Sequence, residues 1–118
     1  MKKIFKQILL LMFVISGALM AEADGPDYYR VKGVAHNDVL NIRNAPNPDA
    51  MKIGEIPPGA NCIKNLGCKG GLTIEEFTTL SKNEQKEILK KRPRWCQVVY
   101  DGIKGWVSAH YLEEESCN

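Results

Sequence analysis

The sequence contains few of the residues that form metal or cofactor sites. It has only two histidines, His36 and His110, and they are not at the spacing of metal ligands. Its four cysteines include no CxxC pair. The segment Glu75-Glu76-Phe77 lacks the adjoining loop of Asp and Asn ligands that binds calcium. We therefore expect no metal ion and no other cofactor.

An excess of basic residues is also missing once the N-terminal residues 1–21 are left out of the count. The chain has 16 Lys and Arg against 14 Asp and Glu, but Lys2, Lys3 and Lys6 lie at its N-terminus. Without residues 1–21 the count is 13 basic against 14 acidic residues, a net charge of −1. A net charge this close to zero provides no basic face for nucleic acid or anionic lipid, and we expect neither as a partner.

A long apolar run occurs only near the N-terminus, over Ile8–Ala21. It is shorter than the roughly 20 residues that span a bilayer, and it follows the three lysines. These features predict a cleaved signal peptide at residues 1–21, with no permanent membrane span afterwards. Ala21-Glu22-Ala23 fits the small-x-small cleavage pattern, and cleavage after Ala21 also fits. The mature chain, residues 22–118, is then expected in the periplasm or secreted.

Export changes the interpretation of the four cysteines, all of which lie in the mature chain. Four cysteines in a short exported chain indicate a disulfide framework, for which three connectivities exist. A zinc site is the alternative, and the missing CxxC pair argues against it. The cysteines are Cys62, Cys68, Cys96 and Cys117.

Short apolar and β-branched runs predict a mainly β fold. Asp101-Gly102 separates two of these runs and predicts a hairpin, because both turn positions need a positive φ. Pro57-Pro58-Gly59 predicts a turn, because two prolines remove two ladder donors. The acidic run Glu113-Glu114-Glu115 is expected to be a solvated tail. The strands are expected over residues 28–34, 39–43, 95–100 and 103–107, with weaker candidates at 53–56 and 61–64.

One segment, about residues 72–93, interrupts the β pattern. Thr73 followed by Glu76, and Ser81 followed by Glu84, have the capping-box form that begins helices. They predict two short helices, about 74–80 and 82–91, the second ended by Pro93. Helices this short are unstable alone, so we expect the insertion to pack onto the strands.

Several motifs in order resemble the bacterial SH3-like domain. Val39–Arg43 and Ile53–Gly59 resemble its opening, while Trp95–Val98 and Gly102–Leu112 resemble its close. The resemblance covers about residues 28–65 and 94–113. It implies a single small SH3-like β-barrel of five or more strands, with the two-helix insertion between strands.

The resemblance also implies specific disulfides and a binding surface. In the implied barrel, Cys68 pairs with Cys96 across the neck of the insertion, and Cys62 pairs with Cys117. Domains of this type bind extended peptides in aromatic grooves. Core packing is the alternative role for the aromatics, with Trp106 buried in the barrel and Trp95 covering a disulfide. The expected ligand-binding residues are Tyr28, Tyr29, Asn44, Trp95 and Tyr111.

The sequence leaves three functional hypotheses, and we expect no catalytic residues. The first, implied by the resemblance together with export, is a non-catalytic envelope-binding module that recognises a peptidoglycan stem peptide. The second is a periplasmic protein–protein adaptor or inhibitor that uses the insertion to bind an envelope protein. The third is an enzyme, a thiol oxidoreductase or a hydrolase. A catalytic Cys–His pair with His110 is disfavoured because every cysteine has a structural partner in the expected barrel.

Overall fold

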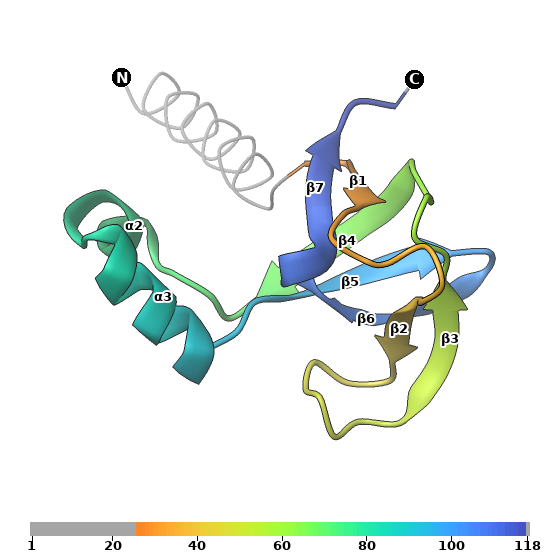
Figure 1. Ribbon diagram of the computed structural model, residues 1–118, viewed down its shortest axis with the longest axis horizontal. Helices are drawn as coiled ribbons and strands as arrows, with labels where there is room; N and C mark the ends of the chain where they lie inside the picture. Colours follow the sequence, from red (N-terminus) through yellow and green to blue (C-terminus); the bar gives the residue numbers. More distant parts are fainter. Residues whose placement is uncertain (1–25, 118) are drawn as a thin grey trace, which may run out of the picture.

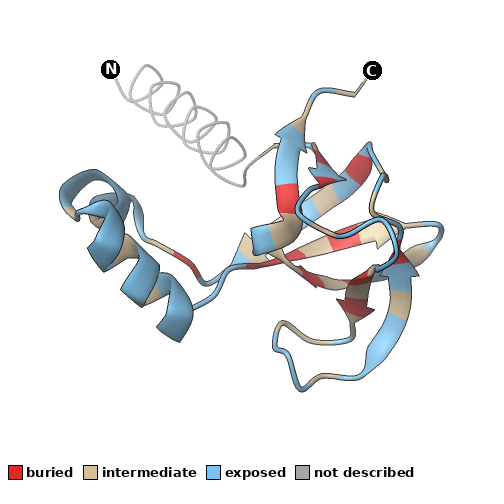
Figure 2. Ribbon diagram, viewed as in Figure 1, coloured by how far each residue is buried: buried red, intermediate tan, exposed pale blue. Residues whose placement is uncertain are grey.

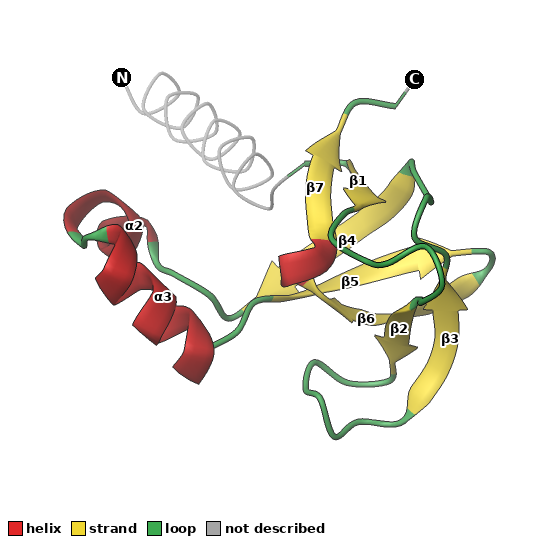
Figure 3. Cartoon of the chain, viewed as in Figure 1, coloured by secondary structure: helices red, strands yellow, loops and turns green. Residues whose placement is uncertain are grey.

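The computed structural model describes residues 26–117, which form a mainly β domain with two short α-helices (Figures 1 and 3). The expected signal peptide, residues 1–21, lies outside the described residues. Within residues 26–117, no helix is both long enough and apolar enough to cross a bilayer. The strands are β1 (Tyr28–Val31), β2 (Leu40–Arg43), β3 (Lys52–Ile56), β4 (Ile63–Lys69), β5 (Trp95–Tyr100), β6 (Ile103–Ser108) and β7 (Leu112–Glu115); the helices are α2 (Ile74–Thr79), α3 (Lys82–Lys91) and the 3₁₀ turn η1 (Ala109–Tyr111).

All seven strands belong to one antiparallel sheet, in the order β3-β2-β6-β5-β4-β1-β7. The hairpin of β5 and β6 pairs continuously from Trp95 opposite Ser108 to Tyr100 opposite Ile103. Its turn has φ of 51° at Asp101 and 77° at Gly102. Both values are positive, so the structure confirms the turn that the Asp-Gly pair predicts.

The sheet curls around one hydrophobic core. Ile56 on β3 and Leu112 on β7 belong to the same buried cluster, although these strands lie at opposite ends of the strand order. On β2, Leu40 and Ile42 face this core while Asn41 and Arg43 face outward, as their alternation predicts. Figure 2 shows the buried positions gathered in the sheet. The core residues are Tyr29, Val31, Leu40, Ile42, Ile56, Ile63, Cys96, Val98, Val107 and Leu112.

Two strand predictions were wrong in extent. The weak candidate at residues 61–64 is the longer strand β4, which continues past a bulge at Asn65 and Gly67 and then pairs with β5. Gly67 has φ of 122°, a value that favours glycine and allows the ladder to resume after the bulge. The predicted acidic tail is strand β7, which pairs with β1. An ion pair of 2.9 Å between Arg30 and Glu113 crosses these two strands.

The two helices of the insertion begin where the capping boxes predict. Thr73 Oγ1 accepts from the Glu76 backbone N–H at 3.1 Å, and the Glu76 carboxylate accepts from the Thr73 N–H at 2.9 Å. Ser81 and Glu84 form the same reciprocal pair at 3.2 and 3.1 Å. Each box satisfies N–H groups that the first helical turn leaves without partners, so these short sequences specify both helix starts locally.

The expectation that the insertion packs onto the strands was wrong. No residue of α2 or α3 is buried, and Ile74 and Phe77 are 84% and 67% exposed. Figure 1 shows the helical pair standing to one side of the sheet. The helices are joined to each other instead, through the Gln85 side-chain amide, which donates to the Phe77 and Leu80 carbonyls, and through an Arg92–Glu76 ion pair.

A narrow neck connects the insertion to the sheet. The Gly71 N–H donates to the Arg92 carbonyl at 2.9 Å across the neck. Gly70 has φ of 77°, and a Cβ at this position would lie 2.5 Å from the Pro93 carbonyl oxygen. Only glycine therefore permits this close approach without a shift of the backbone.

The structure contains the disulfides Cys68–Cys96 and Cys62–Cys117, the pairing that the resemblance implied. Cys68 and Cys96 are opposite each other on β4 and β5, at the base of the neck. The other disulfide joins the C-terminal residues to the segment just before β4. One disulfide thus closes the neck of the insertion, and the other holds the end of the chain to the sheet.

Candidate binding groove

A groove of about 560 Å³ lies between the segment around β2 and the end of the sheet where β5 begins. Trp95 and Tyr111 line it together with residues from the β1–β2 connection. We call this site the aromatic groove. Its lining residues are Gly33, Val34, Ala35, Asp38, Val39, Leu40, Asn41, Arg43, Pro48, Trp95, Ser108 and Tyr111.

Backbone hydrogen bonds hold the two aromatic residues in place. Trp95 begins β5 opposite Ser108 and is 9% exposed. Tyr111 ends η1, and its carbonyl accepts from the Lys32 N–H at 2.9 Å. The His110 ring meets the Tyr111 ring edge-on, with centroids 4.9 Å apart. The backbone of both residues is therefore held in place, with the Trp95 side chain almost wholly buried and the Tyr111 side chain half-buried at the groove.

The groove also carries one side chain of each charge. Asp38 is exposed, and its carboxylate accepts from the Val39 N–H at 2.8 Å. Arg43 is half-buried and donates from Nη1 to the Ala50 carbonyl at 3.0 Å, which anchors the loop after β2. A guanidinium favours carboxylates and a carboxylate favours ammonium groups. The groove can thus contact a ligand that carries both kinds of group beside an apolar surface.

The structure brings together two of the five predicted ligand residues, Trp95 and Tyr111. Tyr28 lies on β1, between Lys64 and Glu115 of the neighbouring strands. Asn44 is exposed just after Arg43, but it does not line the groove. The five residues therefore do not form one site.

Tyr29, another of the five predicted ligand residues, lies in the hydrophobic core. Its side chain is only 3% exposed because the alternation of β1 turns it into the core. The Tyr29 hydroxyl lies 3.4 Å from Cys68 Sγ, and because the disulfide sulfur has no proton, the hydroxyl is the donor. Burial raises the pKa of the Tyr29 phenol, while the Arg94 guanidinium acts in the opposite direction.

Trp106 differs from its expected buried position. On β6, Gly105 and Val107 are buried, so the alternation of the strand turns Trp106 outward, where it is half-buried. The Lys69 ammonium lies 5.4 Å from the Trp106 ring centroid, a cation–π contact. Trp106 lines a second hollow of about 400 Å³, separate from the aromatic groove.

The sequence did not predict that the groove has two charged residues, Asp38 and Arg43. The alternation of β2 offered a signal for Arg43, because it places this residue opposite the core-facing Leu40 and Ile42. Asp38 lies in a polar turn, Ala35-His36-Asn37-Asp38, that looks solvated in sequence. Its approach to the groove depends on how the turn folds back, which no local pattern reveals.

The cysteines offer neither a nucleophile nor thiolate ligands, because all four form disulfides. Cys62, Glu115 and Cys117 place metal-ligating groups close together, but the two sulfurs are bonded to each other. Glu115 instead accepts a hydrogen bond of 2.8 Å from the Cys62 N–H. This cluster therefore stabilises the C-terminal end of the sheet.

Comparison with known proteins agrees with the fold and the motifs. No curated protein matches the chain. The sequence profile described as the bacterial SH3 domain matches residues 75–113, from α2 into β7. The matched residues include Trp95 and Tyr111 of the aromatic groove, and they lie beyond the opening segment, about 28–65, that also showed the resemblance. Residues 75–113 are therefore similar to the bacterial SH3 domain.

Proposed function

We propose that the protein is an exported, non-catalytic binding module of the bacterial envelope that recognises the stem peptide of peptidoglycan. The observation that carries the proposal is the aromatic groove, which combines Trp95 and Tyr111 with Asp38 and Arg43. The bacterial SH3 domain is commonly a cell-wall binding module, which supports the proposal.

The chemistry of a stem peptide suits this groove. Such a peptide is short and carries carboxylate and amino groups, which would pair with Arg43 and Asp38 respectively. The half-buried Tyr111 ring, with the small exposed part of Trp95, offers apolar contact for its backbone and methyl groups. The volume of the groove, about 560 Å³, falls within the range of about 300–1,000 Å³ that small-ligand sites occupy.

The same proposal includes export and a closed barrel. Two disulfides in a domain of this size are typical of proteins outside the cytoplasm, which supports removal of residues 1–21 and a periplasmic or secreted location. The shared core of β3 and β7 supports closure of the curled sheet into an SH3-like barrel.

Co-sedimentation of the disulfide-intact protein with purified sacculi tests the proposal. We expect Tyr111→Ala and Asp38→Asn each to weaken binding by about tenfold, because each removes one contact of the groove. Tyr28→Ala is the matched control, since Tyr28 is a half-buried aromatic residue outside the groove. If the wild-type protein does not sediment, or if Tyr28→Ala weakens binding and Tyr111→Ala does not, the proposal fails.

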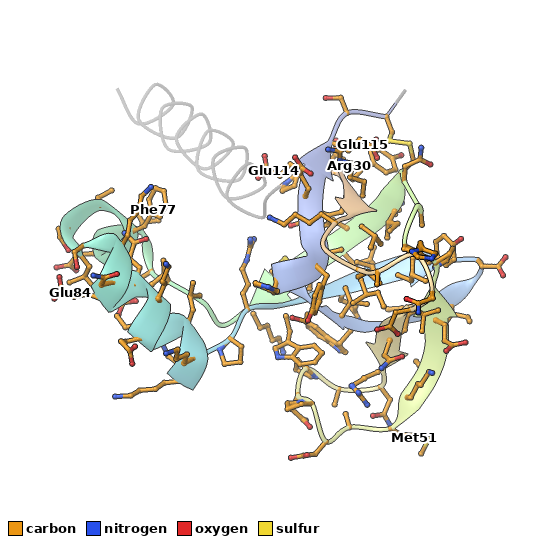
Figure 4. The ribbon with its side chains drawn as sticks, in the orientation of Figure 1. Arg30, Met51, Phe77, Glu84, Glu114 and Glu115 are labelled. Carbon is orange, nitrogen blue, oxygen red and sulfur yellow. A yellow bond between two sulfur atoms is a disulfide. The ribbon has the colours of Figure 1, made fainter. Side chains whose placement is uncertain are left out.

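A second candidate function is a protein–protein adaptor or inhibitor that binds its partner through the insertion. The exposure of Ile74 and Phe77 on α2 favours it, because large apolar side chains at 84% and 67% exposure gain from being covered. Figure 4 shows Phe77 on the insertion, well away from the sheet. Replacing residues 73–92 with a short Gly-Ser loop should abolish partner binding while sacculus binding persists.

A further inference from the structure

A third hollow, of about 620 Å³, lies between the insertion and the sheet domain. α3 and the residues after it form one wall, and the end of β6 with η1 forms the other. We call it the cationic cleft. Its lining residues are Lys86, Leu89, Lys90, Pro93, Arg94, Ser108, Ala109 and His110.

The cationic cleft has charge of one sign around an apolar surface. Lys86, Lys90 and Arg94 line it, and none of its eight lining residues carries a carboxylate. Lys90 pairs with Glu87 at 3.2 Å, but both side chains are highly exposed, so this ion pair is weak and can exchange. The near-neutral net charge of the mature chain therefore conceals a local basic site.

Apolar residues distinguish the cationic cleft from a site that binds anions through charge alone. Leu89, Pro93 and Ala109 line the cleft between its basic residues. Leu89 is 38% exposed, so the cleft leaves it partly open to water. A ligand that fits must therefore bring apolar groups as well as negative charge.

The spacing of the lysines indicates the form of the ligand. Lys86 and Lys90 are one helical turn apart on α3, which separates them by about 6 Å along the helix axis. In an extended chain, side chains two residues apart are separated by about 6.6 Å and point the same way. Carboxylates at alternate positions of an extended segment thus match the two lysines.

We propose that the cationic cleft binds an extended acidic segment of a partner protein, in which carboxylate side chains alternate with apolar ones. Lys86 and Lys90 pair with the carboxylates on the α3 side, and Leu89, Pro93 and Ala109 cover the apolar side chains. This inference rests on the second candidate function, in which the insertion binds a protein partner. It is independent of the aromatic groove, whose only residue in common with the cleft is Ser108.

Fluorescence anisotropy with short labelled peptides tests the inference on the disulfide-intact protein at about 0.15 M salt. We expect a peptide of alternating Glu and Leu to bind, and we expect peptides of alternating Gln and Leu or Glu and Ser to bind at least about tenfold more weakly. The first comparison peptide removes the charge and the second removes the apolar groups. Equal binding of all three peptides would overturn the proposal.

Two charge-matched double variants locate the binding site. Lys86→Glu with Lys90→Glu reverses the lysines of the cleft, and we expect at least about tenfold weaker binding of the Glu-Leu peptide. Lys82→Glu with Lys91→Glu makes the same charge change on the same helix outside the cleft, and binding should change by less than about twofold. Equal losses in both variants would show general electrostatic attraction and overturn the proposal.

Replacement of residues 73–92 by a Gly-Ser loop separates the inference from the function on which it rests. If the replaced protein still binds the peptide, the insertion is not the recognition element and both ideas fail. If binding is lost while the two double variants behave alike, the insertion binds but the cationic cleft does not. Analytical sedimentation of the protein without peptide tests self-association. If the wild-type protein forms a dimer and the Lys86→Glu, Lys90→Glu variant does not, a second copy of the chain occupies the cleft and the proposal is overturned.

Discussion

The sheet domain and the helical insertion are stabilised in different ways. The sheet draws residues from all seven strands into one core, including the fully buried Ile42 and Val98. The two α-helices bury no residue, although their sequence has apolar side chains at helical spacing. Capping boxes, a cross-helix amide and ion pairs order them instead.

This difference shows that apolar periodicity predicts a helix more reliably than it predicts what the helix packs against. Ile74 and Phe77 have the spacing of a helix that covers a core, yet the neck holds them away from the sheet. Exposed apolar side chains on an ordered element are available to a partner. Contacts within the sheet therefore maintain the fold, whereas the apolar side chains of α2 stay exposed.

The largest expected effect is the contrast between one isoleucine in each region. Ile42→Ala removes a fully buried side chain, and we expect the free energy of unfolding to fall by about 2–5 kcal/mol. Ile74→Ala, at 84% exposure, should change it by less than about 0.5 kcal/mol. Urea denaturation followed by tryptophan fluorescence measures both. Similar losses in the two variants would mean that Ile74 packs against the sheet.

A smaller effect is expected at the boundary between the two regions. Replacing Cys68 and Cys96 with alanine opens a disulfide with a sequence separation of 28 residues, and we expect the free energy of unfolding to fall by about 3 kcal/mol. The neck should also loosen, so hydrogen exchange of the Gly71 amide should accelerate.

The matched control for this prediction is replacement of Cys62 and Cys117 with alanine. It opens the other disulfide, with a sequence separation of 55 residues, far from the neck. The free energy of unfolding should again fall, but hydrogen exchange of the Gly71 amide from the native state should stay slow. Equal acceleration in both variants would show that Cys68–Cys96 does not specifically stabilise the neck.

The smallest expected effect is confined to the insertion and depends on pH. Hydrogen bonds from the backbone of Thr73 and Ser81 lower the pKa of Glu76 and Glu84 in the folded protein. A lowered pKa means that folding favours the carboxylate, so the stabilisation is complete above about pH 4.3, the ordinary value for Glu. It is lost as pH falls through the folded pKa. Far-UV circular dichroism should therefore show loss of helix in acid.

Glu76→Gln with Glu84→Gln provides the control for this pH dependence. Glutamine still accepts a hydrogen bond from the N-cap backbone, so the helices should form without a carboxylate to titrate. The acid-induced loss of helix should be reduced in this variant. An unchanged acid transition would assign the pH dependence to other groups.

Most of the secondary structure was predictable because its signals are local. The Asp101-Gly102 hairpin and the two capping boxes depend on residues within a few positions of one another, and all three formed as predicted. β4 was predicted too short because Gly67 resembles an end signal, and only pairing with β5 beyond the bulge shows that the strand continues.

The candidate sites were less predictable because they depend on which face of a strand each side chain occupies. They also depend on contacts between residues that are far apart in the sequence. Tyr28 and Tyr29 are adjacent in sequence, yet the alternation of β1 buries one and leaves the other half-exposed. The aromatic groove joins Asp38 to Trp95, and the cationic cleft joins Lys86 to His110. No sequence spacing places these pairs side by side.

The sequence by itself determined where the strands turn, where the helices begin and that four cysteines form a disulfide framework. These features follow from short-range hydrogen bonds, φ preferences and the chemistry of cysteine. Only the tertiary structure decided which aromatic residues line a groove and that the insertion stands away from the sheet. Those outcomes depend on strand register and on the geometry of the Gly70–Gly71 neck, because contacts between distant residues form only when the strands have paired and the sheet has curled around its core.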